Sequence, residues 1–163
     1  SITAFYTVLV DGDDMDEPIA DKVRGTLDGH IVLSKKLASA YHYPAIDILN
    51  SVSRLANRVS GATTKQACAK MRTLMSIYAK SEELIEVGAY ESGNNPNTDL
   101  AVELHPQIEE FLIQEEMENS SLKDTLDKLS KITGIKIDEG EYPENQDLIQ
   151  ENSFSTDSTE ETF

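Results

Sequence analysis

The sequence predicts a chain of two folded parts, an α/β layer over residues 1–60 and an all-helical region over residues 61–135. The first part alternates short apolar runs with amphipathic helical patterns. In the second part, apolar residues recur every three to four positions. From Lys136 onward this periodicity is lost and Ser, Thr, Asn and acidic residues dominate, so we expect a disordered acidic tail over residues 136–163.

The chain opens with a nearly uninterrupted run of β-branched and aromatic residues at positions 1–10. Such a run is typical of a strand that is covered on both faces inside a parallel sheet. Because a buried strand needs neighbours, we expect its partner strands to lie upstream of this sequence. The carboxylates of residues 11–17 lack the spacing of a calcium loop and predict a solvated turn.

The next segments continue the alternation of helix and strand. Ile19, Val23 and Leu27 lie four residues apart and predict one face of a short helix over residues 18–27. Residues 30–33 then predict a second short strand.

A second helix and a third extended segment complete the predicted α/β part. Ser34 is placed to cap a helix over residues 35–40, and residues 44–47 favour an extended conformation. A polar loop is expected over residues 50–54.

A long helix is expected after Gly61, with Thr63 or Thr64 as its cap and Gly88 as its stop signal. Cys68, the only cysteine, lies beside its apolar stripe and is predicted to be a core residue, and a single cysteine excludes an intrachain disulfide. The stripe consists of Ala67, Met71, Leu74, Tyr78 and Ile85.

The remaining helical region is predicted to contain three shorter helices. Residues 93–97 read as a loop, and two consecutive helices are expected over residues 98–104 and 106–114 because Pro106 favours a first turn. Ser121 opens a last amphipathic helix. Its apolar face is formed by Leu122, Leu126, Leu129 and Ile132.

The charge of the chain argues against a nucleic-acid partner. It has 14 Lys and Arg residues against 30 Asp and Glu residues, a net charge of −16, which repels polyanions. No run of 18 apolar residues occurs, and the single cysteine fits a reducing cytosolic setting. We therefore expect a cytoplasmic protein that binds no nucleic acid.

Residues that could carry chemistry are few. The chain has no Gly-rich phosphate loop ending in Lys and Ser or Thr, so autonomous ATP hydrolysis is not expected. His30, His42 and His105 lie far apart without ligand spacing, so we expect structural or surface roles and no metal site. Arg54, in a Ser-rich segment, could offer a planar guanidinium to a phosphate, or could form an ordinary surface salt bridge.

Several segments taken together resemble one known family. They include the run His-Tyr-Pro-Ala-Ile-Asp at 42–47 and Ser-Val-Ser-Arg at 51–54. The others are residues 1–14, 17–21, 27–34, 84–90 and 111–114. In this order and spacing they are similar to the flagellar and type III export ATPases, which are relatives of the catalytic subunit of F-type ATP synthases.

The resemblance implies that residues 1–60 are the last portion of a RecA-like nucleotide-binding domain of the P-loop NTPase class. Residues 61–135 would then be the helical C-terminal domain. In that family the phosphate loop, the magnesium-site residues and the catalytic glutamate all precede the position of Ser1. ATP and Mg²⁺ would therefore be held mainly by the upstream part, and the chain alone is predicted to be inactive.

The same resemblance implies roles for three residues. Arg54 matches the family's arginine finger, which reaches across the subunit interface to the γ-phosphate held by the next protomer. Tyr43 matches an aromatic residue that packs on the adenine ring, and Phe111 matches a second wall of that pocket. For both aromatic residues, ordinary core packing is the alternative.

The resemblance also implies partners and a location. The parent enzyme would form a homohexamer and bind the regulator, stalk and gate proteins of the export apparatus, together with secretion chaperones and their cargo. It would be cytoplasmic and peripheral at the inner face of the membrane export apparatus.

Two other functions stay open at this point. The chain could be part of an F-type or vacuolar-type rotary ATP synthase subunit, which the sequence upstream of Ser1 would distinguish. It could also be a non-enzymatic interaction module of a secretion apparatus. In that case a start codon would precede Ser1 closely, and no upstream phosphate loop would exist.

Overall fold

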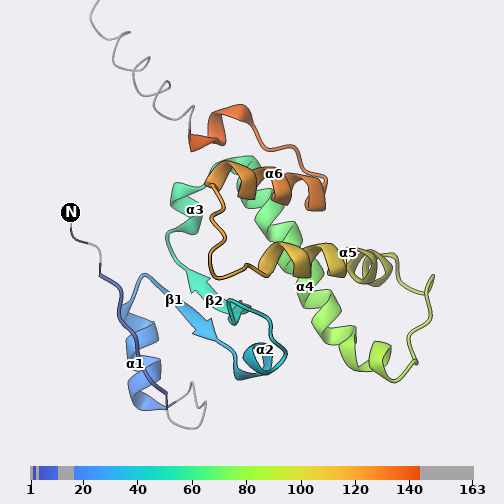
Figure 1. Ribbon diagram of the computed structural model, residues 1–163, viewed down its shortest axis with the longest axis horizontal. Helices are drawn as coiled ribbons and strands as arrows, with labels where there is room; N and C mark the ends of the chain where they lie inside the picture. Colours follow the sequence, from blue (N-terminus) through green and yellow to red (C-terminus); the bar gives the residue numbers. More distant parts are fainter. Residues whose placement is uncertain (1, 3, 11–16, 144–163) are drawn as a thin grey trace, which may run out of the picture.

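The computed structural model describes residues 2, 4–10 and 17–143. Figure 1 shows a pair of strands that lies between helix α1 and a layer of three longer helices. In chain order the elements are α1 (Pro18–Thr26), β1 (Gly29–Leu33), α2 (Lys35–Ser39), β2 (Ile46–Ser53), α3 (Ala56–Val59), α4 (Ala62–Glu86), α5 (Pro96–Leu112), α6 (Leu122–Thr133) and the 3-10 helix η2 (Glu139–Glu141). The predicted order of an α/β part followed by a helical part is confirmed.

Strands β1 and β2 form an antiparallel pair that is interrupted by a bulge. Gly29 pairs with Ser53 and Val32 pairs with Asp47, so β2 carries extra residues over 48–51. The loop predicted over residues 50–54 is therefore wrong, because the backbone after the bulge returns to pair with β1.

The guanidinium of Arg72, on α4, satisfies the carbonyls that the bulge leaves unpaired. Its two terminal nitrogens donate to the carbonyl oxygens of Ile48, Leu49 and Ser51 at 2.7, 3.2 and 3.5 Å. This contact fixes the strand pair against the start of the helical layer.

The predicted strand over residues 1–10 is not formed by the described residues of that segment. They form no strand pairing, and Ile2, Phe5 and Leu9 are more than nine-tenths exposed. A strand requires a neighbour with which to pair. Among the described residues, the two strands β1 and β2 pair with each other and not with this segment.

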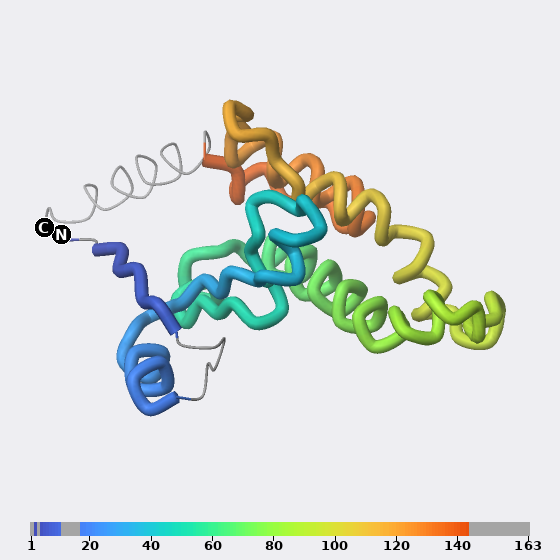
Figure 2. Tube along the Cα trace, turned by 60° about the horizontal axis from the view of Figure 1, so that its bottom comes forward, coloured from blue at the N-terminus to red at the C-terminus, as the bar shows by residue number. Residues whose placement is uncertain are grey.

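The hydrophobic core lies in the helical layer, where α5 and α6 pack against α4 (Figure 2). Ala67, Met71 and Leu74 of the predicted stripe are buried on α4. Cys68, which follows Ala67, is exposed, so the prediction that it is a core residue is wrong. A one-residue step turns a helical side chain by about 100°, which carries Cys68 off the buried face.

Helix α5 is a single helix, whereas two helices were predicted on either side of residue 105. Pro106 removes only its own N–H from the hydrogen-bond ladder. Ala101 and Ile108 are almost fully buried before and after it, so continuing the helix places both in one core. Apolar burial thus outweighs the proline.

The last described residues pack against the helical layer. Ile137 is buried in the core, so the prediction of disorder from residue 136 onward is wrong for residues 136–143. The rest of the predicted tail, residues 144–163, lies outside the described residues.

The predicted cap of α4 is also wrong, because neither Thr63 nor Thr64 caps this helix. The carboxylate of Glu141 instead accepts hydrogen bonds from their backbone N–H groups, at 2.9 and 2.8 Å.

Gly61, the N-cap residue of α4, leaves the room that this carboxylate needs. A Cβ atom at Gly61 would lie 2.0 Å from the carboxyl carbon of Glu141.

Among the described residues, no helix has the length and apolar character needed to cross a membrane.

Candidate functional site

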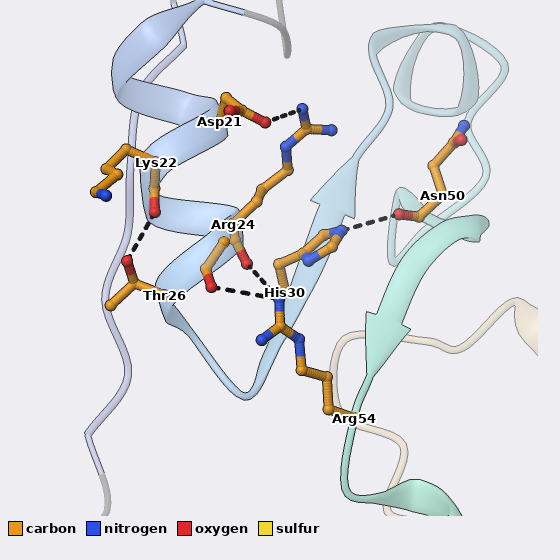
Figure 3. A network of polar contacts seen from close by, with 8 residues as sticks. Asp21, Lys22, Arg24, Thr26, His30, Asn50 and Arg54 are labelled. Atoms are coloured by element: carbon orange, nitrogen blue, oxygen red, sulfur yellow. Dashed lines mark hydrogen bonds and ion pairs between the residues drawn. The ribbon is translucent and has the colours of Figure 1, made fainter.

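Arg54 directly follows β2, and its backbone fixes it beside the turn that precedes β1. Its N–H donates to the carbonyl oxygen of Asp28 at 2.8 Å. In Figure 3 the guanidinium points to the last turn of α1, where Nη2 donates to the carbonyl oxygens of Arg24 and Gly25 at 3.4 Å each. Carbonyls at a helix C-terminus carry partial negative charge and attract a cation.

These contacts orient Arg54 without neutralising it. Both hydrogen bonds lie at the long end of the accepted range, and the side chain is exposed. Within residues 17–143, Arg54 forms no ion pair with a carboxylate. The guanidinium therefore keeps its charge and its remaining N–H groups for an anionic group brought from outside the chain.

Tyr43 lies on a hollow of about 540 Å³ between the α2–β2 connection and the end of α5. Its ring is half exposed, and its carbonyl oxygen accepts a hydrogen bond from the N–H of Gln114 at 2.8 Å. The peptide bond between Tyr43 and Pro44 is cis. The hollow is lined by Tyr41, Tyr43, Pro44, Ile113, Gln114, Glu115 and Glu116.

Phe111 lies close in sequence to this lining but does not belong to it. Its ring is partly buried and packs against the core cluster of the helical layer. The structure therefore brings Tyr43 to the end of α5 without placing Phe111 on the same hollow.

His42 anchors the segment that carries Tyr43. The imidazole is buried, with Nδ1 3.0 Å from a carboxylate oxygen of Glu109 on α5. The structural role expected for this histidine is confirmed. Its partner could not be found from sequence, because 67 positions separate the two residues.

The other two histidines also lie apart from the hollow. His30 contacts the carbonyl oxygen of Asn50 across the strand pair, and the ring of His105 stacks on that of Tyr78. The part of the chain that the structure describes contains no group of three or more His, Cys, Asp or Glu side chains placed to hold a metal ion.

Two family models match the chain. Residues 1–53 match the nucleotide-binding domain of the ATP synthase alpha/beta family, and residues 61–131 match the C-terminal domain of the type III secretion system ATPase EscN.

Individual relatives agree with these matches. The flagellum-specific ATP synthase of Treponema pallidum is 53% identical over 137 residues, which cover 84% of this chain and 31% of that protein. The corresponding protein of Bacillus subtilis is 48% identical, over 82% of this chain and 31% of its own length. The type 3 secretion system ATPase of Pseudomonas savastanoi pv. phaseolicola is also 48% identical, over 82% of this chain and 30% of its own length.

Solved structures show the same relationship. The assembled ATPase EscN from the type III secretion system of enteropathogenic E. coli matches with a TM-score of 0.79 and 41% identity, over 82% of this chain and 32% of that chain. The ATP synthase subunit NeqB of Nanoarchaeum equitans matches with a TM-score of 0.62 and 25% identity, over 77% of this chain and 33% of that one.

The fold is thus that of the end of a RecA-like nucleotide-binding domain followed by a helical domain. The chain belongs to the family of flagellar and type III secretion export ATPases, which are related to ATP synthase subunits. It spans less than a third of the length of the curated relatives cited above.

Proposed function

We propose that this chain is the C-terminal portion of an ATPase that hydrolyses ATP to drive flagellar or type III protein export. Its part in the reaction is to supply the guanidinium of Arg54, in trans, to the γ-phosphate held by a neighbouring subunit. The observation that carries the proposal is the exposed and unneutralised guanidinium of Arg54 at the end of β2. The family relationship supports it.

The surface of the α/β part supports the view that this chain is a portion of a larger domain. Phe5, Leu9, Ile31 and Leu33 expose most of their apolar surface. Ile31 and Leu33 are two positions apart on β1 and lie on the same face of the strand. Neighbouring exposed apolar groups are typical of a surface that another segment covers. Strands that precede residue 1 in the parent protein would cover these side chains. This fits the proposal that residues 1–60 are the last portion of a nucleotide-binding domain.

In the bound state, the phosphates and Mg²⁺ would be held by the upstream part, which carries the phosphate loop in this family. When bound there, the metal ion would neutralise charge on the phosphates. Tyr43 is proposed to pack on the adenine ring, since it lines the hollow at the end of α5. For Phe111 the same role stays a prediction, because its ring packs against the core cluster.

The assembly and partners are proposed from the relatives. EscN has been solved as an assembled ATPase and in complex with its central stalk EscO. A homohexamer that binds stalk, regulator and gate proteins, together with chaperones and cargo, at the cytoplasmic face of the export apparatus is the corresponding proposal for this protein.

The arginine role is tested by steady-state hydrolysis with the complete enzyme carrying Arg54→Ala or Arg54→Lys. Charge spreads over the γ-phosphate oxygens in the transition state, so kcat should fall by about 10³-fold or more while nucleotide affinity changes little. Arg54→Lys should be nearly as inactive, because an ammonium group lacks the planar fork. Arg58→Ala, an exposed arginine on α3, is the matched control.

Mixing experiments separate action in trans from action within one subunit. Wild-type and Arg54→Ala protomers should assemble together, and hydrolysis should fall with the mutant fraction. A loss of less than about tenfold in kcat for Arg54→Ala, against the 10³ expected of a finger, would return Arg54 to a structural role at the end of α1.

A rotary ATP synthase subunit is the runner-up. NeqB is 25% identical to the chain, whereas the export ATPases cited above are 41–53% identical to it. The export function therefore has the stronger support. The other alternative, a non-enzymatic interaction module, predicts that Arg54→Ala leaves every measured activity unchanged.

A further inference from the structure

The turn after α2 contains an unusual residue for its backbone conformation. Helix α2 ends with two hydrogen bonds, from the N–H of His42 to the carbonyl of Leu37 at 3.0 Å and from the N–H of Tyr41 to the carbonyl of Ala38 at 3.1 Å. This pair of bonds defines a Schellman motif, in which the residue at the Tyr41 position adopts positive φ and is usually Gly.

Tyr41 has φ of 58°, and it is the only residue other than glycine with positive φ among those that the structure describes. A bulky aromatic side chain is disfavoured there, since its Cβ crowds the backbone. Burial does not offset this cost, because Tyr41 is 87% exposed. Sparsely populated backbone conformations of this kind concentrate at ligand-binding sites.

Tyr41 borders the hollow described above. It lines this hollow together with Tyr43, Pro44 and Ile113. The turn is held in place from both sides by the Schellman bonds and by the contact of the buried His42 with Glu109. Tyr41 is therefore held by a fixed backbone at the border of a hollow that is also lined by a second aromatic residue, Tyr43.

The chemistry of the hollow favours a flat, uncharged ring as its occupant. Its volume of about 540 Å³ lies within the roughly 300–1,000 Å³ of small-molecule sites. Glu115 and Glu116 on its rim would repel phosphate groups and can accept hydrogen bonds from an exocyclic amine. Two tyrosines and a proline offer surfaces on which a nucleobase can stack.

We infer that Tyr41 forms the second aromatic wall of the adenine site, the role that the family resemblance implies for Phe111. This inference rests on the proposed function, because it names a further residue of the site in which Tyr43 is proposed to contact the base. Tyr41 is retained at a position that favours glycine because its ring stabilises the bound nucleotide.

The test compares ATP with ribose 5′-triphosphate, which keeps the phosphates and lacks the base. Affinities are measured by calorimetry with the complete enzyme and with its Tyr41→Asn, Tyr41→Phe and Tyr43→Ala variants. Asn is chosen because it tolerates positive φ and has no ring. Loss of one stacked base corresponds to a decrease in ATP affinity of about fivefold to a hundredfold.

The expected pattern is specific. Tyr41→Asn should lower the affinity for ATP by that factor and leave the affinity for ribose 5′-triphosphate unchanged. Tyr41→Phe should bind both compounds like wild type. The melting temperature of the chain carrying Tyr41→Asn should equal or exceed that of wild type, because the disfavoured backbone conformation is relieved.

Three results would overturn the inference, and they can be told apart. If Tyr43→Ala selectively lowers the affinity for ATP and Tyr41→Asn does not, the base site exists but Tyr41 is not part of it. If Tyr41→Asn lowers the melting temperature by more than about 5 °C, its role is structural. If wild type binds both compounds equally, no base site exists, and the proposed role of Tyr43 fails together with that of Tyr41.

Discussion

At the scale of single residues, arginines that look alike in the sequence have different tasks in the structure. Arg54 reaches two carbonyls through long hydrogen bonds and stays available, whereas Arg72 contacts three carbonyls of the β2 bulge, one of them at 2.7 Å. The difference lies in what surrounds each guanidinium. A bulge with unpaired carbonyls needs a donor, and Arg72 supplies it from α4.

Replacing Arg72 by Met should therefore lower stability. The side chain keeps most of its apolar length, but the carbonyls of residues 48–51 lose their donor. Hydrogen bonds of this kind contribute about 1 kcal/mol to the free energy of unfolding at an exposed site, which urea denaturation of the chain can measure. Arg58→Met is the control and should leave the free energy of unfolding unchanged. Equal effects of the two substitutions would show that the hydrogen bonds from Arg72 to the bulge do not stabilise the fold.

At the scale of elements, the N-terminus of α4 depends on a residue far along the chain. The Glu141 carboxylate accepts the N–H groups of Thr63 and Thr64, and the N–H of Asp138 donates to the side-chain oxygen of Thr63 at 2.9 Å. Desolvation tends to raise the pKa of Glu141, but the hydrogen bonds from Thr64 and Thr63 outweigh it and lower the pKa to about 2. The carboxylate is thus an N-terminal cap that favours its ionised form.

This cap predicts a pH-dependent contribution to stability. Because the pKa of Glu141 falls from 4.5 to about 2 on folding, the contribution is complete above pH 4.5 and is lost as the pH falls towards 2. Wild type should exceed Glu141→Gln by about 0.5–2 kcal/mol in the free energy of unfolding at neutral pH. The difference should shrink between about pH 4.5 and pH 2.

Urea titrations across this pH range provide the measurement. Glu103→Gln, an exposed position on α5, serves as the control. A difference between wild type and Glu141→Gln that stays constant down to about pH 2 would show that the carboxylate is not the cap.

At the scale of the whole molecule, separate contacts join the strand pair and the C-terminal segment to the helical layer. Arg72 and the pair of His42 with Glu109 hold the strand pair. Burial of Ile137 and the hydrogen bond from Tyr142 to Asp127 at 2.8 Å hold the C-terminal segment on α6. The helical layer is therefore completed by a segment whose composition resembles a disordered tail.

Truncation measures the contribution of this segment. A chain ending at Ile135 loses the buried Ile137 and the cap of α4, whereas a chain ending at Pro143 keeps both. The shorter chain should melt at least about 5 °C lower than the longer one. Equal melting temperatures in calorimetry would mean that residues 136–143 add nothing to the packed core.

Local signals in the sequence predicted most of the elements. Ser34 caps α2 through the N–H of Leu37, Ser121 caps α6, and Gly88 takes the positive φ that ends α4. Each of these signals acts over a few residues, so the sequence can show it directly. The fold class and the family follow from the same local patterns taken in order.

The tertiary structure alone decided how distant residues meet. The sequence could not indicate that Glu141 caps a helix almost eighty positions earlier, or that α5 continues through Pro106. Nor could it place Tyr41, in preference to Phe111, on the hollow beside Tyr43. Periodicity and capping are properties of neighbouring residues, whereas apolar burial and the pairing of polar groups depend on which surfaces the folded chain brings together.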